Sequence, residues 1–233
     1  MKYMGSKSRF KFDILNKIPT TDSVYIEPFA GGMNMMDGVR DARYRLANDS
    51  NKYVIEMFKA LTLGWVPEKL NKQQYLKLKS LNGPDYLIGW AGIACSYSGK
   101  WFGGFADVIE TKNGTIRDYQ SESIRNAVKQ AKNLHEVVFT SLRYDELAIP
   151  EGSVVYCDPP YAGTTGYKDG FDNDKFWEWA RQISKSSDVF VSEYTAPSDF
   201  KCILEIHTKS SLSANGVSGG SKSSSEKLFK LRK

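Results

Sequence analysis

Residues 153–161 read SVVYCDPPY, an apolar run that stops at a carboxylate, two prolines and an aromatic residue. The run predicts a buried β-strand, and the prolines prevent its continuation because they fix φ and lack the backbone N–H. Asp158 and Tyr161 are therefore expected on a stiff turn at the carboxyl end of the strand, where open α/β sheets bind ligands. The turn offers carbonyl acceptors, a carboxylate and a flat ring. Such a set suits an amino group on a planar ring, as in a nucleobase.

The composition is that of an ordinary globular chain. Its 233 residues are 41% hydrophobic and 13% aromatic, which allows one good-sized core with a small inserted subdomain. No apolar stretch approaches the roughly 18 residues of a membrane span. The three cysteines form no Cys-x-x-Cys pair and the two histidines lie far apart in the sequence. We therefore expect a soluble protein of a reducing compartment, with no disulfide framework and no metal site.

The net charge of +5 is concentrated toward the two ends of the chain. Residues 1–20 carry five Lys or Arg against Asp13, and residues 201–233 carry seven against Glu205 and Glu226. Two positive ends are able to form an electrostatic footprint for phosphates. Solvated lysines that keep a protein soluble explain the same pattern equally well.

The order of the predicted elements indicates an α/β fold. Apolar β-rich runs predict strands, and a helical spacing of apolar residues after the second strand predicts a helix. A further helix is expected from the glycine-bearing bend at residues 28–32 to about residue 43. The predicted strands are residues 24–27, 44–49, 137–141, 154–157, 189–192 and 202–208, with a crossover helix at 175–183. The low-complexity segment 213–225 and residues 227–232 predict that the last strand returns as an antiparallel edge hairpin.

Two polar features lie at the ends of the first two predicted strands. The bend at residues 28–32 is not the Gly-x-Gly-x-x-Gly fingerprint, because Met33 and Met35 stand among the later positions. It permits either close approach to a ligand or tight packing of strand and helix. Asp49, at the end of the second strand, is placed to accept from ribose hydroxyls or to cap the helix that follows.

Four motifs together resemble the Dam-type (alpha-class) DNA adenine-N6 methyltransferases. They are KYMGSK at residues 2–7, EPFAGG at 27–32, LAND at 46–49 and DPPY at 158–161. Their order, with a long insertion before the last motif, is similar to that of the family over nearly the whole chain. The resemblance implies a Rossmann-like methyltransferase sheet of seven strands with a C-terminal antiparallel hairpin. It also implies S-adenosylmethionine as the methyl donor, S-adenosylhomocysteine as the product, and no metal.

The resemblance also assigns residues to the donor pocket. By similarity, the pocket is expected to contain Tyr3, Lys7, Glu27, Pro28, Phe29, Gly31, Asp49 and Asp158, with Tyr144 packed against the adenine of the donor. The catalytic group implied is Asp158, Pro159 and Tyr161. We expect a catalytic domain made of residues 1–62 and 137–233.

The remaining segment, residues 63–136, is expected to form an inserted target-recognition subdomain. Its stretch ACSYSGKWFGGF at residues 94–105 resembles the segment through which Dam-type enzymes hold DNA, but Ser96 and Ser98 replace the expected Arg and Asn. The target sequence therefore cannot be carried over from the family. Aromatics interleaved with glycine and lysine suit wedging against bases, and they equally suit an aromatic mini-core. The expected DNA contacts are Lys2, Tyr97, Lys100 and Trp101.

The chemistry explains why these groups are needed. An amine conjugated to a purine is a poor nucleophile, and acceptors on both of its N–H groups localise the lone pair on nitrogen. Asp158 and the Pro159 carbonyl supply those acceptors, and Asp158 also stabilises the cation that forms. The base has to leave the duplex to reach them, and Tyr161 provides a stacking face.

The expected activity is adenine-N6 methylation of double-stranded DNA. The alternatives are cytosine-N4 methylation, which favours serine in place of Asp158, a protein-glutamine or RNA methyltransferase, and a catalytically silent DNA-binding homologue. The expected setting is the cytoplasm of a bacterium or a phage-infected host, with no membrane contact and either a monomer or a weak dimer. Restriction-modification, regulation and phage self-protection all remain open as roles.

Overall fold

The computed structural model describes residues 1–111, 113–160, 171–209 and 223–232. Within these residues the strands are β1 Val24–Glu27, β2 Tyr44–Asn48, β3 Val108–Glu110, β4 Ile116–Asp118, β5 Val137–Thr140, β6 Val154–Cys157, β7 Asp188–Ser192, β8 Phe200–Lys209 and β9 Ser223–Leu231. The α-helices are α1 Lys11–Leu15, α2 Lys52–Thr62, α3 Lys72–Lys79, α4 Asp85–Gly89, α5 Tyr119–Ala131 and α6 Asn173–Ile183.

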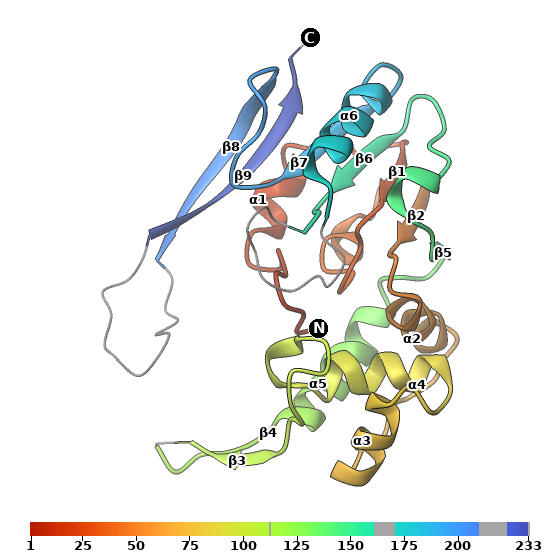
Figure 1. The fold of residues 1–233 in the computed structure, drawn as a ribbon, viewed down its shortest axis with the longest axis vertical. Helices are drawn as coiled ribbons and strands as arrows, with labels where there is room; N and C mark the ends of the chain where they lie inside the picture. Colours follow the sequence, from red (N-terminus) through yellow and green to blue (C-terminus); the bar gives the residue numbers. More distant parts are fainter. Residues whose placement is uncertain (112, 161–170, 210–222, 233) are drawn as a thin grey trace.

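Seven of these strands form one mixed sheet in the order β5-β2-β1-β6-β7-β9-β8 (Figure 1). The first five strands in this order are parallel, with Tyr25 of β1 opposite both Arg45 of β2 and Val154 of β6. β9 lies antiparallel between β7 and β8. The predicted sheet of seven strands with a C-terminal antiparallel hairpin is therefore confirmed.

The two faces of the sheet belong to different apolar clusters. Along β6, Val154 and Tyr156 pack on the face that also contains Ile14 of α1, whereas Val155 and Cys157 pack on the face covered by α6. This alternation follows from the two-residue period of a strand. Because β6 is apolar on both faces, its sequence reads as a continuous apolar run, as expected of a strand buried in a parallel sheet.

Helices α2 to α5 and the β3–β4 hairpin gather at one end of the sheet (Figure 1). Tyr75 of α3 and Trp90 after α4 are buried in the same cluster as Met57 and Phe58 of α2. The apolar core therefore continues without a break from the sheet into this helical part. The predicted division of the chain into a catalytic domain (residues 1–62 and 137–233) and an inserted subdomain (residues 63–136) stays a prediction.

The predicted helix from the glycine bend to about residue 43 is wrong. The structure has only a three-residue 3-10 helix there, Met36–Gly38. Met33 takes a left-handed φ of 55°, which interrupts a helix at its first turn. Met33, Met35, Met36 and Val39 are all buried, so the segment is apolar on several sides and lacks the single stripe that a surface helix presents.

The other predicted elements are found within a few residues of their expected bounds, the crossover helix among them as α6. β9 begins at Ser223, so the last residues of the predicted loop 213–225 belong to a strand. The remainder of that loop, residues 213–222, lies outside the described residues. Among the residues described, no helix is long and apolar enough to cross a membrane.

The close contact between α2 and α4 gives the first prediction. A Cβ on Gly89 of α4 would lie 2.0 Å from the backbone oxygen of Tyr53 in α2, and backbone cannot move aside as a side chain can. We expect Gly89→Ala to destabilise the protein by about 1–3 kcal/mol or more through overpacking. Chemical denaturation followed by circular dichroism measures this change.

Gly83→Ala is the matched control, because its Cβ would meet the flexible end of Leu78 at 2.6 Å. Equal stability losses in the two variants would show that the α2–α4 approach is not as tight as described.

Candidate active site at the carboxyl edge of the sheet

Three neighbouring parallel strands lead into carboxylates at the same edge of the sheet. β1 ends at Glu27, β2 is followed by Asp49 and β6 is followed by Asp158. Pro159 and Pro160 follow Asp158, and neither can donate to a strand ladder. β6 therefore stops at Cys157, and Asp158 follows directly at the carboxyl end of the strand, as predicted. Tyr161, the third predicted catalytic residue, lies outside the described residues.

Asp158 forms a buried ion pair with Lys7. The Lys7 ammonium lies 2.8 Å from Asp158 Oδ1, donates to the Gly5 carbonyl at 3.2 Å, and lies 3.8 Å from Glu226 Oε1. Burial alone lowers the pKa of Lys7, but the attraction of Asp158 and Glu226 outweighs it and holds that pKa above its usual value. Lys7 is therefore charged at neutral pH and fixes the Asp158 carboxylate in place.

Glu27 is a buried carboxyl group beside this pair. Its Oε1 accepts a hydrogen bond from the Tyr25 hydroxyl at 3.1 Å. Burial raises the pKa of Glu27 well above its usual value, the Tyr25 hydrogen bond opposes this rise, and the charge of Asp158 adds to it. Glu27 is therefore protonated well above the pH at which a solvated glutamate ionises, and it adds little negative charge to the site.

The glycine bend and Asp49 are joined directly. The Gly31 N–H donates to Asp49 Oδ2 at 2.9 Å, and the Asn51 N–H donates to Oδ1 at 2.9 Å. Burial raises the pKa of Asp49 and these two bonds oppose the rise. The cap of α2 is Asn51, whose side chain accepts from the Tyr53 N–H. Asp49 therefore ties the bend to the end of β2 and does not cap the helix.

Gly31 has a physical reason to be glycine. Its φ is +47°, and a Cβ there would lie 2.8 Å from the ring of Tyr3. A Cβ on Gly32 would lie 2.5 Å from Tyr3 Cβ. The bend therefore provides the surface on which Tyr3 packs, and this contact holds the first residues of the chain against the site. Pro28 is fixed beside it, because its carbonyl accepts from Asn48 Nδ2 at 3.0 Å.

Phe29 and Tyr144 meet next to the bend. Their ring centroids lie 5.2 Å apart, and Tyr144 also lies 5.8 Å from Phe176 of α6. Aromatic pairs at such distances pack favourably edge-on or tilted. The structure thus brings two predicted donor-pocket residues into one apolar patch beside Asp49 and Gly31.

The first residues of the chain connect this site with the helical part. Met4 N–H donates to the Gly99 carbonyl at 3.2 Å, and a Cβ on Gly99 would lie 2.7 Å from the Lys2 backbone oxygen. Lys2 lies in a hollow of about 240 Å³ whose lining includes Tyr97, Arg117 and Tyr119. Two predicted DNA contacts, Lys2 and Tyr97, therefore share one concave surface.

Sequence reasoning missed two members of this hollow, Arg117 and Tyr119. The Lys2 ammonium lies 4.8 Å from the Tyr119 ring centroid, and Arg117 lies 5.0 Å from the same centroid. Arg117 also forms a two-pronged ion pair with Glu122 at 3.0 and 2.8 Å. The basic-aromatic pairing IRDY at residues 116–119 is the signal in the sequence that would have suggested them.

The other predicted DNA contacts differ in exposure. Tyr97 is 63% exposed and Lys100 is exposed. Trp101 stacks on Tyr53 at 5.9 Å, and a Cβ on Gly92 would lie 2.4 Å from its ring. Trp101 is therefore packed into the helical part, as in an aromatic mini-core, and its contact with DNA stays a prediction.

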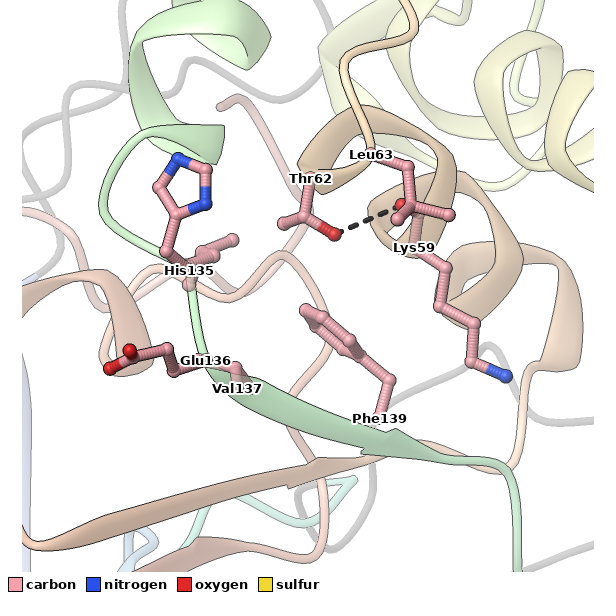
Figure 2. Close-up of a pocket in the computed structure, with 8 residues that line it drawn as sticks. Lys59, Thr62, Leu63, His135, Glu136, Val137 and Phe139 are labelled. Carbon is pink, nitrogen blue, oxygen red and sulfur yellow. Dashed lines mark hydrogen bonds between the residues drawn. The ribbon is translucent and has the colours of Figure 1, made fainter.

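A larger hollow of about 380 Å³ lies elsewhere, between the end of α2 and the start of β5 (Figure 2). Figure 2 shows Phe139 of β5 pointing toward Thr62 of α2. The lining of this larger hollow includes none of the predicted site residues. Within the described part of the chain, no group of three or more His, Cys, Asp or Glu side chains is placed to hold a metal ion.

Comparison with known proteins agrees with this geometry. Residues 3–87 match the model of the family D12 class N6 adenine-specific DNA methyltransferase. This match agrees with the resemblance seen in the sequence over these residues. The match includes residues 3–7 of the KYMGSK motif, the glycine bend and Asp49, and it ends before DPPY.

Two curated relatives are a modification methylase and a type II methyltransferase. The chain is 26% identical to modification methylase StsI of Streptococcus sanguinis over 197 residues, 73% of this chain and 30% of the relative. It is 26% identical to the type II methyltransferase M.FokI of Planomicrobium okeanokoites over 208 residues, 78% of this chain and 32% of the relative. The chain thus spans about a third of the length of these relatives.

Among solved structures, the tRNA methyltransferase TrmI from Aquifex aeolicus superposes with a TM-score of 0.44 and 10% identity. The superposition covers 97% of this chain and 70% of the other.

The buried Glu27 gives a prediction on pH. A carboxyl group whose pKa is raised by folding stabilises the protein at low pH, and this contribution is lost as the pH rises above the unfolded pKa. Glutamine stays neutral and still accepts from Tyr25. We expect Glu27→Gln to be more stable than the wild type near neutral pH, by a margin that grows between about pH 5 and pH 8. Thermal unfolding across that range measures the margin, and a constant or shrinking margin would show that Glu27 is ionised in the fold.

Proposed function

We propose that the chain is a DNA adenine-N6 methyltransferase that uses S-adenosylmethionine and acts on an adenine flipped out of duplex DNA. The observation that carries this proposal is the placement of Asp158. Its carboxylate lies directly before two prolines at the carboxyl end of β6, paired with Lys7 at 2.8 Å, at the edge of the sheet where Asp49 holds the glycine bend. The D12 match over residues 3–87 supports the same activity.

The residues present fit the proposed methyl donor. Asp49 is a half-buried carboxylate at the end of β2, suited to ribose hydroxyls. Phe29 and Tyr144 form an apolar patch suited to a flat adenine. The donor would supply an electrophilic methyl group on a sulfonium. Asp49 would then orient the ribose, Phe29 and Tyr144 would pack on the base, and Tyr3 would close the pocket from the glycine bend.

Asp158 and Pro159 would act on the amine. In this proposal the Asp158 carboxylate accepts one amino hydrogen and the Pro159 carbonyl accepts the other, which localises the lone pair on nitrogen. The nitrogen becomes cationic as the new carbon–nitrogen bond forms, and Asp158 stabilises that charge in a site with little water. Tyr161 would stack on the flipped base. Lys2, Tyr97, Lys100, Trp101 and the newly found Arg117 and Tyr119 would contact the DNA.

The direct test of the activity is transfer of labelled methyl groups to duplex DNA, with digestion to nucleosides and mass spectrometry. We expect N6-methyladenine as the product, and base-resolution mapping then gives the target sequence. N4-methylcytosine would identify the cytosine alternative. Donor binding with no transfer to any DNA would identify a silent homologue.

Replacement of Asp158 tests the mechanism. A group that acts mainly in the transition state lowers the turnover number more than it weakens binding. We expect Asp158→Ala to lower the single-turnover rate by roughly 10²–10³-fold, by analogy with the loss of one oxyanion-hole donor, while DNA affinity stays near that of the wild type. Asp158→Asn, which keeps the shape and one acceptor, should retain more activity than alanine. A normal rate in Asp158→Ala would contradict the assigned role.

Replacement of Asp49 tests the donor pocket. Loss of a charge-assisted hydrogen bond to a ribose should weaken binding of S-adenosylmethionine by about 1.5–3 kcal/mol, measured by calorimetry. Asp41→Ala is the control, because Asp41 is an exposed carboxylate that accepts from Thr20 and Thr21. Unchanged affinity in Asp49→Ala would remove Asp49 from the pocket.

A further inference from the structure

Among the described carboxylates that are paired with Lys7, Glu226 has no role in the proposed chemistry. It lies near the start of β9, at 3.8 Å from the Lys7 ammonium, and its side chain is only 12% exposed. Lys7 and Asp158 are 6% and 21% exposed. The three groups therefore interact in a medium with little water, where charges act on one another more strongly than at the surface.

The position of Glu226 follows from the sheet. β9 runs antiparallel to β7, so its first residues lie at the edge where the parallel strands end. Glu226 is two residues before Leu228, and alternate residues of a strand share a face. Leu228 is buried in the apolar cluster that contains Tyr25 and Tyr156. Glu226 therefore emerges on the same face, at the same edge, as Glu27 and Asp158.

The charges in the cluster do not cancel. The attraction of Asp158 and Glu226 holds the pKa of Lys7 above its usual value in spite of burial, and burial raises the pKa of Glu27 well above its usual value. If Lys7 faced Asp158 alone, the pair would be neutral and the carboxylate would have little field left for a cation forming on the amine. Glu226 is a second carboxylate within 4 Å of the same ammonium, so that, among these three described side chains, two carboxylates face one cation.

We propose that Glu226 is a positioning residue for methyl transfer. Its carboxylate interacts with the Lys7 ammonium and weakens the hold of that ammonium on Asp158. Asp158 then keeps the negative charge that stabilises the amine nitrogen as it becomes cationic. This inference rests on the proposed function and adds a residue from the C-terminal hairpin to it. Glu226 touches neither base nor donor in this role. Its effect reaches the amine through Lys7 and Asp158.

The proposal predicts a split between turnover and binding. Glu226→Gln keeps the shape and removes the charge, so we expect the single-turnover rate to fall on the order of tenfold, within the range of coupled neighbouring groups. The affinity for DNA and for S-adenosylmethionine should stay near that of the wild type. Glu205→Gln is the matched control, since it removes a carboxylate from the same hairpin, one that is 39% exposed and 3.5 Å from Lys227. The control should keep the wild-type rate.

A second set of variants, in which Lys7 is also replaced, tests whether Glu226 acts through Lys7. In Lys7→Met there is no ammonium to share, so adding Glu226→Gln should cause no further loss of rate. The same loss in both backgrounds, or no loss in the wild-type background, would overturn the proposal. Glu226→Asp keeps the charge and serves if the glutamine variant does not fold. Glu226→Asp should retain most of the wild-type rate. If Glu226→Asp lost as much of the rate as Glu226→Gln, the proposal would also be overturned.

An inactive wild-type chain would instead reject the proposed function. The two failures are therefore distinguishable in the same set of assays.

Discussion

The buried ion pair between Lys7 and Asp158 is the interaction on which the site depends. It joins the first residues of the chain to the turn after β6 at 2.8 Å, and neither segment has a strand or helix of its own at that point. A charge this poorly solvated is stable only if its partner is present and further hydrogen bonds are made. Lys7 meets that condition through Asp158, the Gly5 carbonyl and Glu226.

The path of the first residues follows from this pair. With Lys7 fixed, Tyr3 packs on Gly31 and Gly32, and Lys2 lies in the hollow with Arg117 and Tyr119. One short segment thus touches the sheet edge, the glycine bend and the helical part. This arrangement explains how the sites proposed for donor, amine and DNA are held together although they come from distant parts of the sequence.

The sequence predicted the sheet well because its strands are apolar runs bounded by turns and polar residues. The run at residues 154–157 could only be a buried strand, and the prolines after it placed Asp158 at its end. The helix expected before residue 43 failed because the left-handed φ of Met33 interrupts it, and because Met33, Met35 and Met36 are buried on several sides and do not form the single stripe of a surface helix. Local spacing does not report such a backbone change.

The contacts between the residues of the site were harder to predict than the identity of those residues. Two contacts depend on how β2 and the antiparallel hairpin are placed in the sheet. They are the hydrogen bond between Asp49 and Gly31 and the approach of Glu226 to Lys7. No local pattern contains that information. Arg117 and Tyr119 were missed because their role depends on the position of Lys2, which is more than a hundred residues away in the sequence.

The most direct measurement of the central claim is a double-mutant cycle on the free energy of unfolding, with Lys7→Met, Asp158→Asn and the two combined. If the pair holds the site as described, each single variant removes one side of a largely buried ion pair, and the double variant should be more stable than the sum of the two losses by about 1–3 kcal/mol. Losses that add to within about 0.5 kcal/mol would show that Lys7 and Asp158 are independent and would contradict the account.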